Sequence, residues 1–60
     1  MDKDQEIEAL DESAAQGEGY LEAAKSGFRE IGDEEGEAKA DEALGRIAEV
    51  REHIRRSREG

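Results

Sequence analysis

The chain has 60 residues, of which 18 are acidic, 9 are basic and one is His, so its formal net charge is −9. This length allows one small domain, and we treat residues 1–60 as that domain. The absence of Cys excludes disulfides and thiolate metal sites, and the acidic balance disfavours nucleic acid, whose phosphates need a basic surface. Leu, Ile, Val and Phe together number only nine, so the core is thin and oligomerisation is the expected source of further stability.

We expect neither a membrane span nor an export signal. No apolar run approaches the roughly 18 residues that a membrane span needs. The sequence MDKDQE at the start lacks the apolar region of a signal peptide. We therefore expect a cytoplasmic protein that does not contact a membrane. Pro is absent and helix-forming residues dominate, which predicts an all-α fold.

The first predicted helix covers about residues 2–15, with an apolar stripe at Ile7, Leu10 and Ala14. Gly17 and Gly19 follow it closely, and we expect them to break the chain into two helices there. The first helix should then pack against the second as an antiparallel hairpin.

The second predicted helix covers about residues 19–31. Its apolar residues recur at spacings of three and four, as expected for one buried face. They are Leu21, Ala24, Phe28 and Ile31. Gly32 can end this helix in a left-handed conformation, and Asp33 can cap the next one.

The third predicted helix covers about residues 34–57 and is the longest. Its apolar residues repeat at three and four, as in a coiled coil, and run through Ala40, Ala43, Ile47, Val50 and Ile54. Because this helix is longer than its neighbours, its end should overhang them and expose an apolar stripe. We expect a partner or oligomer interface at Ala43, Ile47, Val50 and Ile54. The expected core consists of Ile7, Leu10, Leu21, Ala24, Phe28, Ile31 and Leu44.

The segment from Phe28 to Gly45 resembles the junction between two tetratricopeptide repeats. It contains Gly32-Asp33, Gly36, Ala38 and then Leu44-Gly45, and the triplet Glu-Ala-Leu at residues 8–10 recurs at 42–44, a period of 34. In this register the family's aromatic and small positions match Tyr20 and Ala23, while its later aromatic position holds Gly27. The resemblance covers one and a half repeats and implies antiparallel helix pairs that bind protein.

A fainter resemblance joins Ser13-Ala14-Ala15, Phe28, Glu34-Glu35-Gly36 and Ile47-Ala48 to the helices of rubrerythrin-type ferritin-like proteins. That family binds iron through Glu and a Glu-x-x-His pair. Here the only His is His53, and the residue three before it is Val50, so the ligand pair is broken. This resemblance implies four-helix packing without the iron chemistry.

Few residues suggest chemistry. Glu49 and His53 lie four residues apart and are weak metal-ligand candidates, although an exposed hydrogen bond between them is the favoured explanation of this spacing. We expect no cofactor, no catalytic residue and no enzymatic activity. The sequence instead predicts a tetratricopeptide-like module for protein–protein interaction or self-assembly, whose partner is protein and in the first place a second copy. The alternatives are a ferritin-like metal-binding oligomer and an acidic mimic of nucleic acid that inhibits a basic protein.

Overall fold

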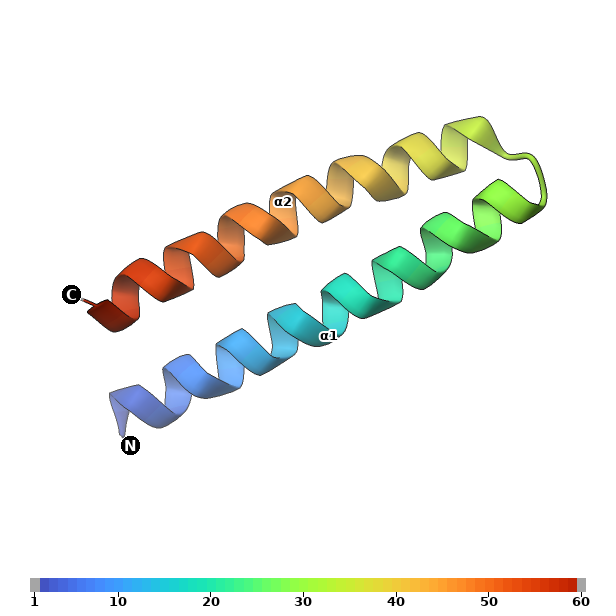
Figure 1. Cartoon of the computed structure of the whole chain (residues 1–60). Coiled ribbons are helices and arrows are strands. Elements are labelled where there is room, and N and C mark those ends of the chain that lie inside the picture. Colours follow the sequence, from blue (N-terminus) through green and yellow to red (C-terminus); the bar gives the residue numbers. More distant parts are fainter. Residues whose placement is uncertain (1, 60) are drawn as a thin grey trace.

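A computed structural model describes residues 2–59, which form two long helices, α1 (Lys3–Glu30) and α2 (Glu34–Glu59). The helices run antiparallel side by side, and their free ends lie together opposite the turn (Figure 1). The molecule measures 45 × 16 × 12 Å. The all-α hairpin is thus present, but within residues 2–59 it has two helices where three were expected. Neither of them is long and apolar enough to cross a membrane.

The predicted helices 2–15 and 19–31 are one continuous helix, so the break expected at Gly17 and Gly19 does not occur. Neither of these two glycines has a positive φ; among the described residues only Gly32 does. Each Gly weakens a helix by about 1 kcal/mol relative to Ala, and contacts with a neighbouring helix can offset that cost. Here Gly17 lies against Ile47, because a Cβ placed on it would be 3.3 Å from the Ile47 Cδ1 atom. Packing against α2 therefore outweighs the local preference for a break.

The turn between the helices forms as the sequence predicts. Gly32 adopts φ +75° and ends α1, while the Asp33 N–H donates to the Phe28 carbonyl at 2.9 Å and the Gly32 N–H donates to the Arg29 carbonyl at 3.2 Å. These two bonds define a Schellman motif. The Asp33 carboxylate then accepts a 2.9 Å hydrogen bond from the Gly36 N–H, which caps α2. At the other end of the hairpin, Asp2 caps α1 in the same way through the Asp4 N–H at 3.1 Å.

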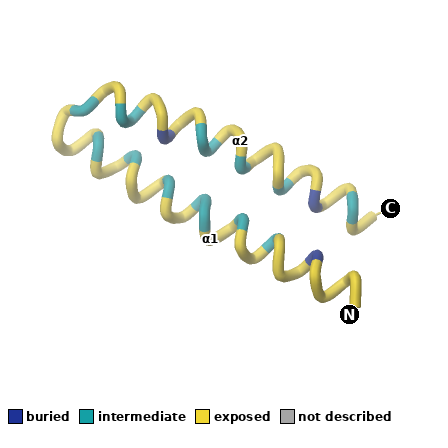
Figure 2. The backbone as a smooth tube through the Cα atoms, turned by 180° about the vertical axis from the view of Figure 1, so that it is seen from behind, coloured by how far each residue is buried: buried dark blue, intermediate teal, exposed yellow. Residues whose placement is uncertain are grey.

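A row of apolar residues on each helix, repeated every seven positions, forms the contact between the helices. We call this row the seam; it consists of Ile7, Ala14, Leu21 and Phe28 in α1 and Ala40, Ile47 and Ile54 in α2. Ile7, Ala40 and Ile54 are buried and the others are half-buried (Figure 2). A seven-residue repeat is the signature of helices that pack as a coiled coil. The core is therefore one residue wide along each helix.

Several residues expected in the core lie outside the seam. Leu10, Ala24 and Ile31 are exposed, whereas Leu44 is half-buried. The predicted overhang is also absent, because α1 has 28 residues and α2 has 26, so the two are nearly equal in length. Both corrections have the same cause, since joining the first two predicted helices turns one face of α1 toward α2 along its whole length.

Among the described glycines, Gly36 has the closest neighbour, the Phe28 ring, which lies beside the turn. A Cβ added to Gly36 would lie 2.5–2.8 Å from three ring atoms of Phe28, which is closer than real Cβ atoms approach. At Gly19 and Gly45 an added Cβ meets nothing within 4 Å. Glycine is thus required at residue 36 by packing, while the other two positions tolerate a side chain.

We expect Gly36→Ala to lower the free energy of unfolding by about 1–2 kcal/mol, since the strain of overpacking exceeds the helix-propensity gain. Gly19→Ala and Gly45→Ala serve as matched controls and should raise it by up to about 1 kcal/mol. Urea denaturation followed by circular dichroism, at one protein concentration for all variants, measures these changes. A destabilising Gly19→Ala would contradict the continuity of α1.

Candidate functional site

One face of the hairpin is closed by ion pairs between the helices. Asp11, Glu18 and Lys25 each lie four positions after a seam residue of α1, and Arg51 lies four positions after the seam residue Ile47. The Arg51 guanidinium lies 3.3 Å from the Glu18 carboxylate and 3.8 Å from that of Asp11. All three side chains are about one third exposed, so the cluster covers one edge of the seam.

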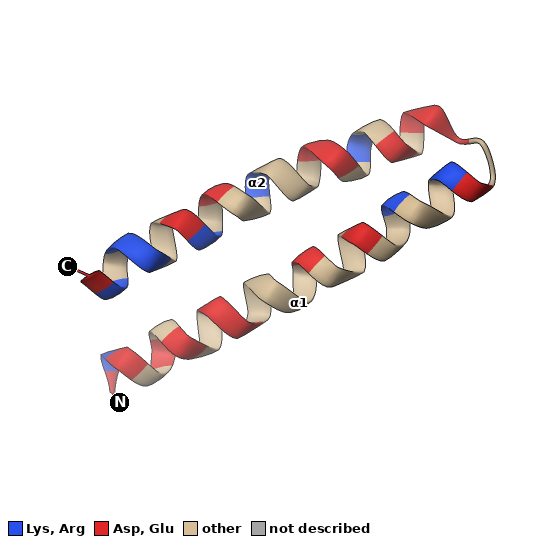
Figure 3. Cartoon of the chain, in the orientation of Figure 1, with Lys and Arg blue, Asp and Glu red and all other residues tan. Residues whose placement is uncertain are grey.

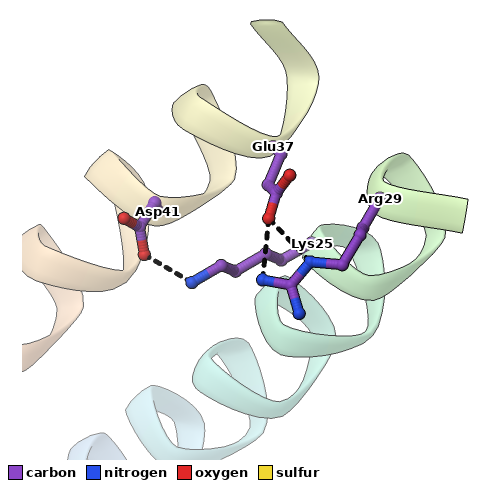
Figure 4. A network of polar contacts seen from close by, with 4 residues as sticks. All are labelled: Lys25, Arg29, Glu37 and Asp41. Carbon is purple, nitrogen blue, oxygen red and sulfur yellow. Dashed lines mark hydrogen bonds and ion pairs between the residues drawn. The ribbon is translucent and has the colours of Figure 1, made fainter. Parts of the chain in front are cut away.

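The same face continues toward the turn with two shorter pairs. The Lys25 ammonium donates to the Asp41 carboxylate at 2.8 Å, and the Arg29 guanidinium lies 2.7 Å from the Glu37 carboxylate (Figure 4). The hydrogen bond from Lys25, together with its positive charge, lowers the pKa of Asp41 below its usual value. We call this surface the ionic face; it comprises Asp11, Glu18, Lys25, Arg29, Glu37, Asp41 and Arg51.

The opposite face is fixed by the geometry of an antiparallel pair. In a helix with 3.6 residues per turn, positions three and four after a seam residue lie on opposite flanks of the seam. The ion pairs show that the flanks four positions after the seam residues meet on one face. The flanks three positions after the seam residues therefore lie together on the other face. We call this the open face; its core positions are Leu10, Gly17, Ala24 and Ile31 from α1 and Ala43, Val50 and Ser57 from α2.

The open face carries the large apolar side chains that the hairpin leaves uncovered. Leu10 is 58% exposed, Val50 is 51% and Ile31 is 76%, and Tyr20, one turn beyond Gly17, is 77% exposed. A shallow groove beside Leu10 is lined by Glu6, Ala9, Leu10 and Ser13. Charged residues in α1 are red or blue in Figure 3, and by their helical positions those between Ile7 and Phe28 lie off the open face. They are Glu8, Asp11, Glu12, Glu18, Glu22 and Lys25.

The predicted interface residues divide between the seam and the open face. Ile54 is buried and Ile47 is half-buried against α1, so both are occupied within the single chain. Val50 and, at half exposure, Ala43 remain on the open face. Of the four predicted interface residues, Ala43 and Val50 are therefore the two that α1 leaves uncovered, and the interface itself stays a prediction.

The sequence contained a signal for the ionic face that we did not use. Asp11, Glu18 and Lys25 recur every seven residues beside the apolar repeat of α1, and Glu37 and Arg51 lie fourteen residues apart on α2. Such spacing places charges along the rim of a helix pair. The pairing itself could not be read from the sequence while α1 was divided into two helices.

The weak metal-ligand candidates Glu49 and His53 are both exposed and lie one turn apart on α2. Within residues 2–59 no three His, Cys, Asp or Glu side chains come together as a metal site would require. A second groove, lined by Asp11, Glu18, Ala48, Arg51, Ile54, Arg55 and Arg58, lies beside the Arg51 cluster near the free ends. Its charged residues are already engaged in part by the ion pairs of Arg51.

The chain was compared with known proteins at three levels, and no protein-family model, curated protein or solved structure matches it. The tetratricopeptide and ferritin-like resemblances therefore stay predictions.

The lowered pKa of Asp41 gives a local test of the ionic face. In Lys25→Met the pKa of Asp41 should rise toward its ordinary value of 3.8, because both the hydrogen bond and the adjacent charge are lost. A depressed pKa means that the pair stabilises the fold above the ordinary Asp pKa, and that this contribution is lost as the pH falls through the lowered value. Carboxyl-carbon NMR titration measures the shift.

Lys39→Met is the matched control, because Lys39 pairs with Glu35 at 3.4 Å and not with Asp41. It removes the same charge and should leave the titration of Asp41 nearly unchanged. Equal shifts in the two variants would mean that net charge, and not the Lys25–Asp41 contact, sets the pKa of Asp41.

Proposed function

We propose that this chain is a non-enzymatic module for protein–protein interaction and self-assembly, and that it binds through its open face. The observation that carries the proposal is the position of Leu10, Tyr20 and Val50. These large apolar side chains are exposed together in a chain of which 45% is charged. Large apolar side chains left exposed on one face of a small, highly charged protein favour that face as an interaction site.

The energetics of the hairpin support the same proposal. Among residues 2–59 only Ile7, Ala40 and Ile54 are buried, and no large side chain is fully buried. Burial of apolar surface contributes about 25 cal/mol per Å², and a core this thin offsets little of the conformational entropy lost on folding. A partner on the open face supplies the missing burial, so folding and association are coupled.

Val50→Asp should weaken self-association by at least about tenfold, because burying a Val side chain is worth about 1.5–3 kcal/mol and the variant places a charge there instead. Sedimentation equilibrium over a dilution series, with helicity recorded on the same samples, measures this effect. Ala38→Asp is the control; Ala38 is exposed on α2 and lies off both the seam and the open face.

A comparison of Val50→Asp with Ile47→Asp distinguishes loss of contact between copies from loss of the contact between α1 and α2. Ile47→Asp should remove helicity at every concentration, because Ile47 contacts α1 within the chain. Val50→Asp should lose helicity mainly on dilution. A wild-type protein that stays folded and monomeric over the whole series would overturn the self-assembly proposed here.

Salt distinguishes self-assembly from the binding of a basic partner. Two copies each carrying a net charge of −9 repel one another, so screening should strengthen their association as NaCl rises from low to physiological levels. A basic protein bound by an acidic mimic would show the reverse dependence. Self-association that weakens steeply with salt would show that ionic contacts, and not the open face, hold the copies together.

A further inference from the structure

The open face of α1 carries a stripe with no charge in its middle. This α1 stripe consists of Leu10, Ser13, Gly17, Tyr20, Ala24 and Gly27, at alternating spacings of three and four. Leu10, Ser13, Tyr20, Ala24 and Gly27 are exposed, and Gly17 is half-buried. Among the described residues, no side chain of α2 covers Tyr20 or Leu10, which are both more than half exposed.

The α1 stripe is complementary in size to itself when it is reversed about Gly17. An antiparallel copy places Leu10 opposite Ala24 and Ser13 within one residue of Tyr20, while the two Gly17 backbones meet at the centre. Each large side chain thereby faces a small one. Small residues at a helix contact allow the backbones to approach closely, and facing large and small residues interdigitate.

The open face of α2 is also complementary in size to itself when it is reversed. The centre of this reversal lies at the same height along the hairpin as Gly17. Reversal about the point between Arg46 and Ile47 places Ala43 opposite Val50. Gly17 and Ile47 lie level with one another, since a Cβ on Gly17 would be 3.3 Å from the Ile47 Cδ1 atom. One twofold axis, perpendicular to the helices, thus relates both pairs of stripes at once. The axis also brings Arg46 near its copy, and each Arg46 is already paired with its own Glu42 at 3.2 Å.

The size of the face suits a dimer of this kind. A face of 45 by 16 Å has an area of about 700 Å², close to the roughly 800 Å² per partner of a standard interface. The ionic face, with its charges already paired across the helices, stays on the outside of such a dimer.

We infer that two copies pack face to face through their open faces, with each α1 stripe antiparallel to the α1 stripe of the other copy, to form a four-helix bundle. This inference rests on the proposed function and specifies its partner and geometry. The alternative isologous arrangement, in which α1 lies across α2 of the other copy, would set Tyr20 and its uncharged neighbours against the rim of Lys39, Arg46 and His53. The antiparallel arrangement of α1 instead buries uncharged surface against uncharged surface along α1, and sets the rim of α2 only against its own copy.

Cysteine cross-linking tests this geometry without background, because the chain has no Cys. Ser13→Cys and Tyr20→Cys are made as separate proteins and oxidised alone or as an equimolar mixture. A disulfide needs Cα atoms within about 7 Å. Reversal about Gly17 offsets Ser13 from its own copy by eight residues and Tyr20 from its own copy by six, about 12 and 9 Å along the axis, so neither protein should cross-link efficiently alone. The mixture should form several-fold more cross-linked heterodimer. Leu10→Cys mixed with Ala24→Cys repeats the test with a different pair.

The molecular mass in solution of each reduced variant is measured at the protein concentration used for oxidation. Together with the cross-links, it distinguishes three outcomes. Efficient cross-linking of each protein alone means that the two α1 helices run parallel, which overturns this geometry. Dimeric mass without any of these cross-links places the α1 stripe away from α1 of the other copy and also overturns it, but leaves self-assembly standing. Monomeric mass for the wild-type chain at every concentration overturns the geometry and the proposed self-assembly together.

Discussion

The seam between α1 and α2 is the contact on which the rest of this structure depends. Its residues recur every seven positions, so it stays on one side of each helix along the full hairpin. The seam fixes the rotation of both helices, and their rotation decides which side chains fall on each flank. The ionic face and the open face are therefore consequences of one apolar repeat. A rotation of α1 by one residue would place different side chains in both.

The two flanks of the seam are equivalent in geometry but differ in their side chains. On the ionic face, Arg51 reaches two carboxylates of α1 and Lys25 reaches Asp41, so charge is compensated between the helices. Exposed ion pairs of this kind add little to stability because solvent screens them, but they favour this pairing of the two helices over other registers. On the open face the described residues form no ion pair between the helices, and Leu10 and Val50 remain more than half exposed. The asymmetry directs any further packing to a single surface.

Local rules predicted the ends of the helices better than their middles. Gly32 and Asp33 act within a few residues, through a left-handed backbone and a side-chain cap, and the structure has both where the sequence placed them. Gly17 and Gly19 carry the same local signal for a break, but contacts with Ile47 and α2 outweigh it. Nothing within a few residues of Gly17 indicates that a helix thirty positions away will cover it. Dividing α1 into two helices then placed Leu10, Ala24 and Ile31 in the core. Two short helices that pack on each other bury other positions than one long helix that packs on α2.

The predicted site was affected by the same error. Ile47 and Ile54 were correctly placed on the apolar row of α2, but a helix packs its row against whichever partner lies beside it. With α1 extended to 28 residues, that partner is within the chain, and only Ala43 and Val50 are left outward. A two-helix core one residue wide cannot enclose large side chains on both of its flanks. The uncovered flank of such a hairpin is therefore a direct result of its architecture, and the α1 stripe from Leu10 to Gly27, which has no charged member, lies on that flank.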